Sequence, residues 1–472
     1  LLNRSVIGGF KRFATITTVL ARHGLGEIAQ RLLRRSRKGD LPTGAGYLTP
    51  ERLRRVLEEL GPSFIKLGQL MSTRADVFPP EYIEELSKLQ DRVPPVAFAD
   101  IRKVIEGELN TGLDTAFTEF DETAMAAASV AQVHSARLTT GEKVAVKVIR
   151  PGIAKMIRND IRLMYYLARR IEAAFEVGRI LGVINIVKEF ERTIFRELDM
   201  FMEGGNIEKF AAGFGEVDEI YIPKVHWDFT TRSILVMEHI DGIKMDQVDQ
   251  IRAAGIDPEE VAMIGLHSFS RQLLEVGTFH ADPHPGNTIV MYDGRVSLVD
   301  FGITGYLDEE TMLQIAYIFL GYAEHDYDMV IDALVEAGII DPESIDLTSF
   351  RIDLTDMSEP FYGRALATIS VKDVYEQVMQ VVLKYRLHLP RNLMLLLKTF
   401  IQTEALGKIL GSKASLLEVI RPYARKLLQK GYDTQKLLKN MGRDLRDVGM
   451  VTRQLPRLTH EILKRTATGR HR

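Results

Sequence analysis

The chain has 472 residues, 46% of them hydrophobic and 26% charged, which is enough apolar content for about two or three packed units and excludes a disordered chain. It contains no cysteine, so disulfides, thiolate metal sites and cysteine nucleophiles are excluded. The net charge is only -3, but residues 1–40 and 421–472 are strongly basic and the region between them is acidic.

The basic ends allow two interpretations: contact with anionic membrane lipid, or a pair of solvated helix faces. No nucleic-acid-binding motif accompanies the charge, so we expect no nucleic-acid partner. The best candidate for a long apolar run, Leu393 to Leu406, is interrupted by Lys398 and Glu404. We therefore expect no segment that spans a bilayer.

Helical patterns fill the first part of the chain. Ile28, Leu32 and Leu33 recur at helical spacing, and Thr49 to Glu51 is typical of an N-cap followed by proline at the first helical position. We expect an all-helical N-terminal extension over residues 1–120.

Strand patterns begin after this extension. Val133 to Leu138 and Lys143 to Ile149 alternate in the manner of strands, and turn residues separate them, which predicts a β-hairpin. Helical periodicity returns through Val187 to Phe201, and strand-like segments follow over Ile220 to Val225 and Ser233 to Met237. The simplest interpretation is a small sheet with a helix inserted between its strands.

From Val261 to about Leu410 the pattern is mainly helical. A proline-rich loop, Ala281 to Asn287, interrupts it, and two short strands follow over Thr288 to Val290 and Val296 to Val299. The Asp293-Gly294 pair between these strands is a strong signal for a hairpin turn.

The clearest chemistry lies in this second half. Asp282 is followed five residues later by Asn287, and Asp300 begins an Asp-Phe-Gly triplet after an apolar strand. This order matches the protein-kinase plan, because Mg²⁺ prefers carboxylate and amide oxygens and phosphoryl transfer needs an oriented nucleophile. We predict that Asp282 orients or deprotonates the acceptor, and that Asn287 and Asp300 hold the metal.

Simpler interpretations exist for each motif. Either motif alone could be a turn with a capping side chain. His280 and His284 could belong to a zinc site, although no third nitrogen ligand is evident. The presence of both motifs, with a hairpin between them, favours the kinase interpretation.

A lysine occupies the middle of an upstream apolar strand. Lys147 stands where kinases keep the lysine that contacts the α- and β-phosphates. Its burial requires an acidic partner, and Glu197, Asp199 and Glu203 are the candidates. The alternative is an exposed lysine at a sheet edge.

Alanines stand where a kinase carries its glycine-rich phosphate loop. The segment consists of Ala126, Ala127, Ala128, Ser129 and Val130. Because alanine rarely adopts a positive φ, the phosphates must be held differently. In isolation, an alanine-rich helix is the alternative.

Together these motifs resemble the UbiB family of atypical kinase-like proteins, which support isoprenoid-quinone biosynthesis. Four motifs carry the resemblance, which covers roughly residues 50–410: K-x-G-Q at Lys66-Leu67-Gly68-Gln69, the alanine-rich loop from Ala126, E-x-D at Glu197-Leu198-Asp199, and the kinase residues Asp282, Asn287 and Asp300.

The resemblance implies an α+β, protein-kinase-like bilobal fold, with a small β-sheet N-lobe and a mainly helical C-lobe. After the extension we expect the N-lobe over residues 121–240, the C-lobe over 241–412, and a basic helical tail over 413–472. The hinge would run through Met237 to Ile240, where Glu238 and Ile240 would offer backbone groups to adenine.

It also implies two ion pairs. Lys147 would contact the nucleotide phosphates and pair with Glu203, although two glycines follow Glu203, each of which costs about 1 kcal/mol inside a helix. Lys66 would reach Glu197 inside the active site, with Gln69 beside it, so that the extension covers the opening where a peptide would dock. The alternative is that Lys66 extends into solvent.

We therefore expect an ATP- and Mg²⁺-binding kinase or ATPase that supports ubiquinone-type biosynthesis. The resemblance implies a cytoplasmic protein held peripherally at the membrane, with anionic lipid and quinone-biosynthesis enzymes or lipid intermediates as partners, and a longer form with C-terminal membrane helices. The alternatives are a nucleotide-switched scaffold without turnover and a protein kinase. Asp308 to Glu310 indicates a helix start soon after the Asp-Phe-Gly triplet, which disfavours the protein kinase because no peptide-docking segment fits between them.

Overall fold

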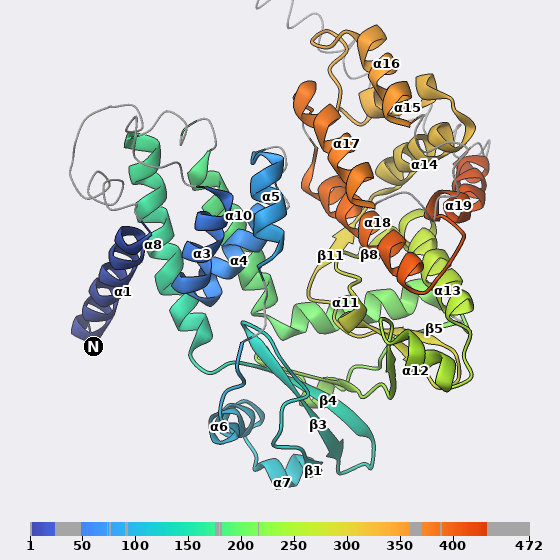
Figure 1. Cartoon of the computed structure of the whole chain (residues 1–472). Helices are drawn as coiled ribbons and strands as arrows, with labels where there is room; N and C mark the ends of the chain where they lie inside the picture. Colours follow the sequence, from blue (N-terminus) through green and yellow to red (C-terminus); the bar gives the residue numbers. More distant parts are fainter. Residues whose placement is uncertain are drawn as a thin grey trace, which may run out of the picture.

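The computed structural model describes residues 2–23, 49–72, 74, 77–89, 93–174, 179, 182–215, 217–358, 371–387 and 389–431. Within these ranges it has a small β-sheet region at one end and a larger helical region at the other (Figure 1). The predicted α+β bilobal class is confirmed. No helix among the described residues is both long enough and apolar enough to cross a membrane.

Helices form almost all of the described extension. They are α1 (Leu2–Arg22), α3 (Pro50–Leu60), α4 (Pro62–Met71), α5 (Pro80–Ser87), α6 (Phe98–Leu109) and α7 (Leu113–Ala116). The predicted N-cap is present, because the Thr49 side chain accepts a hydrogen bond from the Arg52 amide at 3.3 Å. The predicted helix around Ile28 lies outside the described residues. The last four residues of the range 1–120 form a strand rather than a helix.

The first sheet contains β1 (Phe117–Phe120), β3 (Ala131–Leu138), β4 (Lys143–Ile149) and β6 (Ile234–Glu238) in that order, and β2 (Ala126–Ala127) also pairs with β3. The hairpin predicted between residues 133 and 149 is confirmed. Its turn contains Gly141 with a φ of 95°, which a residue with a β-carbon adopts only with strain.

Among the residues that the structure describes between β4 and β6, three α-helices stand where one was expected: α8 (Ile153–Ala174), α10 (Val183–Glu197) and α11 (Met200–Phe214). The prediction of one helix through Phe201 was wrong, because the chain turns after Glu197 and Asp199 caps a new helix by accepting from the Phe201 amide at 3.2 Å. The short strand β5 (Ile220–Tyr221) was also expected in the first sheet. It pairs in parallel with β10 (Val296–Leu298) in a second sheet instead.

The second sheet has the order β5, β10, β9 (Thr288–Met291) and β7 (Gly242–Lys244). β9 and β10 form the predicted hairpin around Asp293 and Gly294, with a φ of 89° at Gly294. A third sheet pairs β8 (Thr278–His280) with β11 (Thr304–Tyr306), so the strands before Asp282 and after Asp300 are neighbours.

The remaining elements are mostly helices. They are α12 (Val248–Ala253), α13 (Pro258–Arg271), α14 (Glu309–Glu324), α15 (Tyr327–Glu336), α16 (Leu347–Ser358), α17 (Val371–Lys384), α18 (Arg391–Ile409) and α19 (Leu416–Gly431), with short 3₁₀ turns at Trp227–Phe229 and Pro285–Asn287 and a π turn at Gln272–Val276. Figure 1 shows α12 and α13 in yellow-green and the helices from α14 to α19 in yellow to red.

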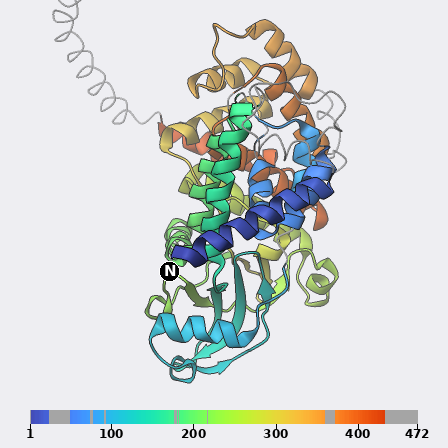
Figure 2. The same cartoon turned by 90° about the vertical axis from the view of Figure 1, so that its left-hand side faces the viewer.

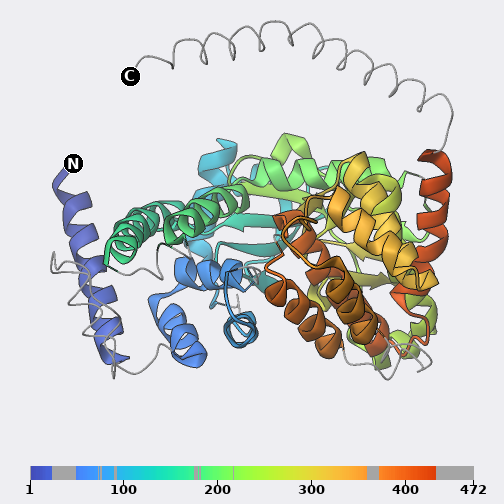
Figure 3. The same cartoon turned by 90° about the horizontal axis from the view of Figure 1, so that it is seen from above.

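The extension shares its apolar core with both lobes. Phe64 and Leu86 belong to the same buried cluster as Phe190 of α10. Ile83 of α5 belongs to a second cluster, together with Phe350 of α16. Figure 2 shows α1 crossing α8 above the first sheet, and Figure 3 shows the blue extension helices beside the orange helices of the C-lobe. The extension is therefore packed as part of the main body.

Candidate active site

Lys147 lies at the centre of the site. It comes from β4, and its Nζ lies 2.6 Å from Oε1 of Glu203 on α11 and 3.3 Å from Oδ1 of Asp300. Its side chain is 13% exposed, so the alternative of a solvated edge lysine does not describe it. Among the three candidate acids, the structure selects Glu203, as the resemblance implied, and not Asp199, which caps α11.

The glycines that follow Glu203 have a local explanation. A β-carbon on Gly204 would lie 2.9 Å from the ring of Trp227, so only glycine lets α11 approach this indole so closely. A β-carbon on Gly205 would meet nothing within 4 Å. α11 nevertheless runs unbroken from Met200 to Phe214 and holds Glu203 in place.

The Asp300-Phe301-Gly302 triplet is anchored by a buried ring. Phe301 is fully buried and packs edge-on against Phe210 of α11, with ring centroids 5.0 Å apart, and against His280 at 5.5 Å. The Gly302 amide donates to Asp300 Oδ1 at 3.0 Å. Because Phe301 joins α11 to the loop, Asp300 and Glu203 are positioned by the same contacts.

The loop from His280 to Asn287 is held by its own hydrogen bonds. The Asp282 amide donates to His280 Nδ1 at 3.1 Å, and the Asn287 side-chain amide donates to the Asp282 carbonyl at 3.2 Å. The Val299 amide then donates to the Asn287 carbonyl at 3.1 Å, which ties this loop to the strand that leads to Asp300. The three residues predicted to act on the acceptor and the metal thus lie on one connected framework.

Sequence reasoning missed two residues that contact Asp282. Lys398 Nζ lies 3.0 Å from Asp282 Oδ1, and the Gln402 side-chain amide lies 3.4 Å from the same oxygen. Both come from α18, where we had noted Lys398 only as an interruption of an apolar run. A lysine in such a run is itself a signal, because it needs a polar partner when the helix packs.

Charge and burial together shift the pKa values of the central groups. Burial favours a lower pKa for Lys147, but the Asp300 and Glu203 carboxylates outweigh it and raise the pKa above its ordinary value. Burial opposes the ionisation of Asp300, yet Lys147 and the Gly302 amide hold its pKa well below the usual range. Burial raises the pKa of Glu203 to about 7; Lys147 opposes this rise and the neighbouring Asp300 carboxylate adds to it. The site therefore keeps Lys147 charged and Asp300 ionised.

The oxygen atoms at this site suit magnesium. The contacts of Asp300 with Lys147 and Gly302 are made by Oδ1, and Asn287 uses its amide nitrogen, so Asp300 Oδ2 and Asn287 Oδ1 are the atoms that would meet a cation. One carboxylate and one amide oxygen, completed by phosphate and water, form a common magnesium environment.

A zinc site around the two loop histidines is not formed. His284 Nδ1 accepts from the Gly286 amide at 2.9 Å and so caps the turn of the loop. Across the described part of the chain, no group of three or more histidine, aspartate or glutamate side chains is placed to hold a metal ion.

The alanine-rich segment forms a strand and a tight turn, so the alternative of a helix was wrong. Ala126 and Ala127 form β2, and the Ala128 amide donates to the Ala131 carbonyl at 2.8 Å to close a turn over Ser129 and Val130. None of these residues has a positive φ, as expected for a turn without glycine. The buried Ser129 hydroxyl has no hydrogen-bond partner among the described residues.

The predicted hinge follows β6. The Glu238 amide donates to the Lys224 carbonyl at 2.8 Å, and its carboxylate accepts from the Tyr221 hydroxyl. Ile240 is buried as the chain passes from β6 towards β7. The position suits a hinge, although the Glu238 amide is already engaged within the protein.

Lys66 and Gln69, the two polar residues of the K-x-G-Q motif, both make contacts within the protein. Lys66 Nζ lies 3.1 Å from Glu197 Oε2, and these side chains are only 14% and 11% exposed. The Gln69 side-chain amide donates to the Leu89 carbonyl at 3.1 Å, so Gln69 braces the extension itself. The alternative in which Lys66 extends into solvent is therefore wrong.

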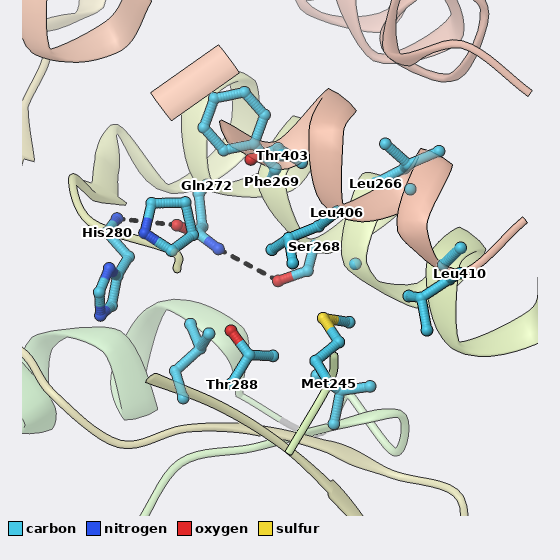
Figure 4. A pocket seen from close by; sticks show the side chains of 16 residues that line it. Met245, Leu266, Ser268, Phe269, Gln272, His280, Thr288, Thr403, Leu406 and Leu410 are labelled. Carbon is cyan, nitrogen blue, oxygen red and sulfur yellow. Dashed lines mark hydrogen bonds between the residues drawn. The ribbon is translucent and has the colours of Figure 1, made fainter. Parts of the chain in front are cut away.

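A small cavity of about 40 Å³ lies behind the loop from His280 to Asn287 (Figure 4). Its lining is mostly apolar and includes Leu266 and Leu406, with His280 at one side. Gln272 spans one wall, accepting from the His280 amide at 2.9 Å and donating to Ser268 at 3.1 Å. Ligand pockets commonly reach about 300 Å³ or more, so this space is too small for a nucleotide.

Comparisons with known proteins agree with this geometry. Residues 88–334 match the ABC1 atypical kinase-like domain, and residues 354–415 match the UbiB helical domain. Over 417 residues the chain is 36% identical to the probable protein kinase UbiB of Marinobacter nauticus, covering 88% of this chain and 76% of that protein.

A solved structure of Rv3197 in complex with erythromycin, from Mycobacterium tuberculosis, is also similar, with 23% identity and a TM-score of 0.48. The match covers 72% of this chain and 92% of that chain.

Proposed function

Because this chain belongs to the UbiB family of ABC1 atypical kinase-like proteins, we propose that it binds ATP and Mg²⁺ and transfers or hydrolyses the terminal phosphoryl group in support of isoprenoid-quinone biosynthesis. One observation carries the proposal. Lys147 Nζ lies within 3.3 Å of both Glu203 and Asp300, in a framework that also holds Asp282 and Asn287.

In this proposal each residue has one task. Glu203 holds Lys147, whose ammonium contacts the α- and β-phosphates. Asn287 and Asp300 hold magnesium, which when bound neutralises charge on the phosphates. Asp282 accepts the proton of the acceptor hydroxyl as the new oxygen–phosphorus bond forms and the bond to the β-phosphate oxygen breaks, leaving ADP.

The alanine turn at residues 126–130 would cover the nucleotide, and the segment from Glu238 to Ile240 would meet adenine. A turn without positive φ restricts how closely its backbone amides approach the phosphates. Lys147 and the metal would therefore neutralise more of the phosphate charge.

The proposed acceptor of the phosphoryl group is water or a small, lipid-like molecule rather than a peptide. β11 begins two residues after Gly302, and Asp308 caps α14 by accepting from the Thr311 amide at 2.8 Å. The predicted helix start is confirmed. All residues of this stretch are described, and none remains for a peptide-docking segment.

Nucleotide binding is the first test. MgATP should raise the melting temperature of the wild-type protein, and Asp300→Asn should lose most of that rise because it removes a metal ligand. Equal stabilisation of both proteins would remove the assignment of Asp300. Phosphate release, measured with and without anionic vesicles, then separates an enzyme from a nucleotide-switched scaffold, which would bind without turnover.

A membrane role is part of the proposal. Ion pairs within the protein already engage some of the basic residues near the two ends. Arg12 pairs with Asp160, and on α19 Arg425 and Lys426 pair with acids of the C-lobe. The other basic residues of the two ends are the candidates for anionic lipid, at about 1 kcal/mol each near a surface.

Co-sedimentation with phosphatidylglycerol vesicles should fall as salt is added, and should be weaker with neutral phosphatidylcholine vesicles. Vesicle binding that changes with neither salt nor lipid charge would overturn the electrostatic contribution.

A further inference from the structure

One face of α18 is directed at the catalytic loop. Lys398 and Gln402 are four residues apart, which places them on the same side of a helix, and both donate to Oδ1 of Asp282. These residues lie beyond the part of the chain that matches the kinase-like domain and inside the part that matches the helical domain. A separate region of the chain thus supplies both donors to the proposed catalytic carboxylate.

This arrangement is fixed by further contacts. The Asn392 side-chain amide, near the start of α18, donates to the Tyr306 carbonyl of β11 at 2.8 Å. Further along, Thr403 and Leu406 line the cavity behind His280 (Figure 4). α18 is therefore held against β11 before Lys398, and it lines the cavity beside His280 after it.

We propose that Lys398 positions the Asp282 carboxylate for phosphoryl transfer, so that the helical domain completes the active site. The inference rests on the proposed function, in which Asp282 accepts the proton of the acceptor. With Oδ1 held by Lys398 and Gln402, the carboxylate is fixed in rotation and Oδ2 is the oxygen that meets the acceptor hydroxyl. His284 Nε2 lies 3.9 Å from Oδ2 and borders that position.

The two donors to Asp282 differ in charge. Lys398 forms an ion pair with the carboxylate, whereas Gln402 is neutral and contributes only a hydrogen bond. A substitution of Lys398 therefore removes a charge and a donor from Oδ1, and a substitution of Gln402 removes a donor alone.

An ordinary structural ion pair would behave differently. The two side chains are 37% and 28% exposed, and ion pairs with this much solvent contact contribute about 0 to 1 kcal/mol to stability. Removal of Lys398 should therefore change the melting temperature little. A large change in turnover with a small change in stability separates positioning from structural support.

The test compares Lys398→Met, Lys398→Arg and, as a control on the same helix, Lys408→Met. Lys408 is ten residues from Lys398, or about 15 Å along the axis. We expect Lys398→Met to lose about tenfold or more in kcat. The KM for MgATP should change little. Lys398→Arg should recover much of the loss, and Lys408→Met should match the wild type.

A Lys398→Met variant with wild-type kcat would overturn the inference and leave the proposed function standing. A wild-type protein that is not stabilised by MgATP would overturn the proposed function, and the inference with it. One that binds MgATP without turnover would overturn phosphoryl transfer and the inference together, and leave only nucleotide binding. If Lys398→Met does not fold, Gln402→Leu removes the second donor, and an unchanged kcat in Gln402→Leu would contradict the positioning role.

Discussion

Lys66 of α4 and Glu197 at the end of α10 form a largely buried ion pair, with Nζ and Oε2 3.1 Å apart. Asp199, two residues on, caps α11, the helix that holds Glu203. The pair therefore joins the extension to the start of the helix that positions Lys147. A contact at this place can restrict how α11 and Lys147 are positioned, whereas a contact at the surface could not.

We predict that Lys66→Ala redistributes activity, with faster phosphate release or label incorporated into the protein itself, because the extension no longer restricts the opening. Arg74→Ala is the matched control, since Arg74 Nη1 also joins the extension to α10 through Glu189 at 2.5 Å. Both readouts are measured with radiolabelled ATP. Identical behaviour of Lys66→Ala, Arg74→Ala and wild type would contradict a gating role.

Two adjacent glycines on α11 should respond in opposite ways to alanine. Gly205→Ala should stabilise the protein by up to about 1 kcal/mol, because alanine favours helix and the site is open. Gly204→Ala gains the same propensity but must displace Trp227, whose indole donates to Glu208 at 2.7 Å, and overpacking costs about 1 to 3 kcal/mol. Thermal unfolding should place Gly204→Ala below Gly205→Ala. The reverse order would show that Trp227 moves away without cost.

The Arg12–Asp160 ion pair should contribute to the free energy of unfolding because Asp160 is buried. Arg12 Nε lies 2.7 Å from Asp160, which is 1% exposed, and Arg12 also donates to the Leu60 carbonyl at 2.6 Å. Arg12→Met leaves a buried charge unpaired, and such losses are about 3 to 5 kcal/mol. Denaturant unfolding should show this loss and a substantial recovery in the double variant Arg12→Met/Asp160→Leu.

The control for this pair is Arg22→Met, since Arg22 pairs with Glu59 at the surface and should cost less than about 1 kcal/mol. Equal losses for Arg12→Met and Arg22→Met would argue against the role of burial.

The low pKa of Asp300 predicts a pH-dependent contribution to stability. A carboxyl whose pKa is lower in the folded state stabilises the protein above its ordinary pKa of 3.8, and this contribution is lost as the pH falls through the folded-state value. The difference in melting temperature between wild type and Asp300→Asn should therefore be steady at neutral pH and shrink only as the pH falls below 3.8. A difference that stays constant across this acidic range would contradict the prediction.

Sequence patterns predicted the features of this structure that are determined by residues close together in the chain. The hairpin around Gly141 and the helix start at Asp308 follow from turn and cap chemistry, and both are present. The spacing of Asn287 and Asp300 indicated a shared site because kinase chemistry needs both on adjoining loops.

Other features depend on contacts between distant segments. Lys398 and Asp282 are 116 residues apart, and no local pattern states which carboxylate a lysine within an apolar helix will meet. The pairing of β5 with β10 was missed because a two-residue strand has almost no pattern of its own, so its sheet is chosen by tertiary packing. The break before α11 was missed because apolar residues on both sides keep a helical spacing, and only the cap at Asp199 marks it.

The apolar clusters that join the extension to both lobes define what can fold alone. A chain cut just before residue 88, where the match to the kinase-like domain begins, would lose Phe64 and Leu86 from around Phe190, and Ile83 from around Phe350. The surfaces left behind would be apolar and exposed to water, which favours aggregation over a stable shorter protein. The start of the match to the kinase-like domain is therefore not a boundary of autonomous folding. The helix that meets Glu197 also packs in the apolar core of the lobes, so a truncation that removes that contact exposes the core as well.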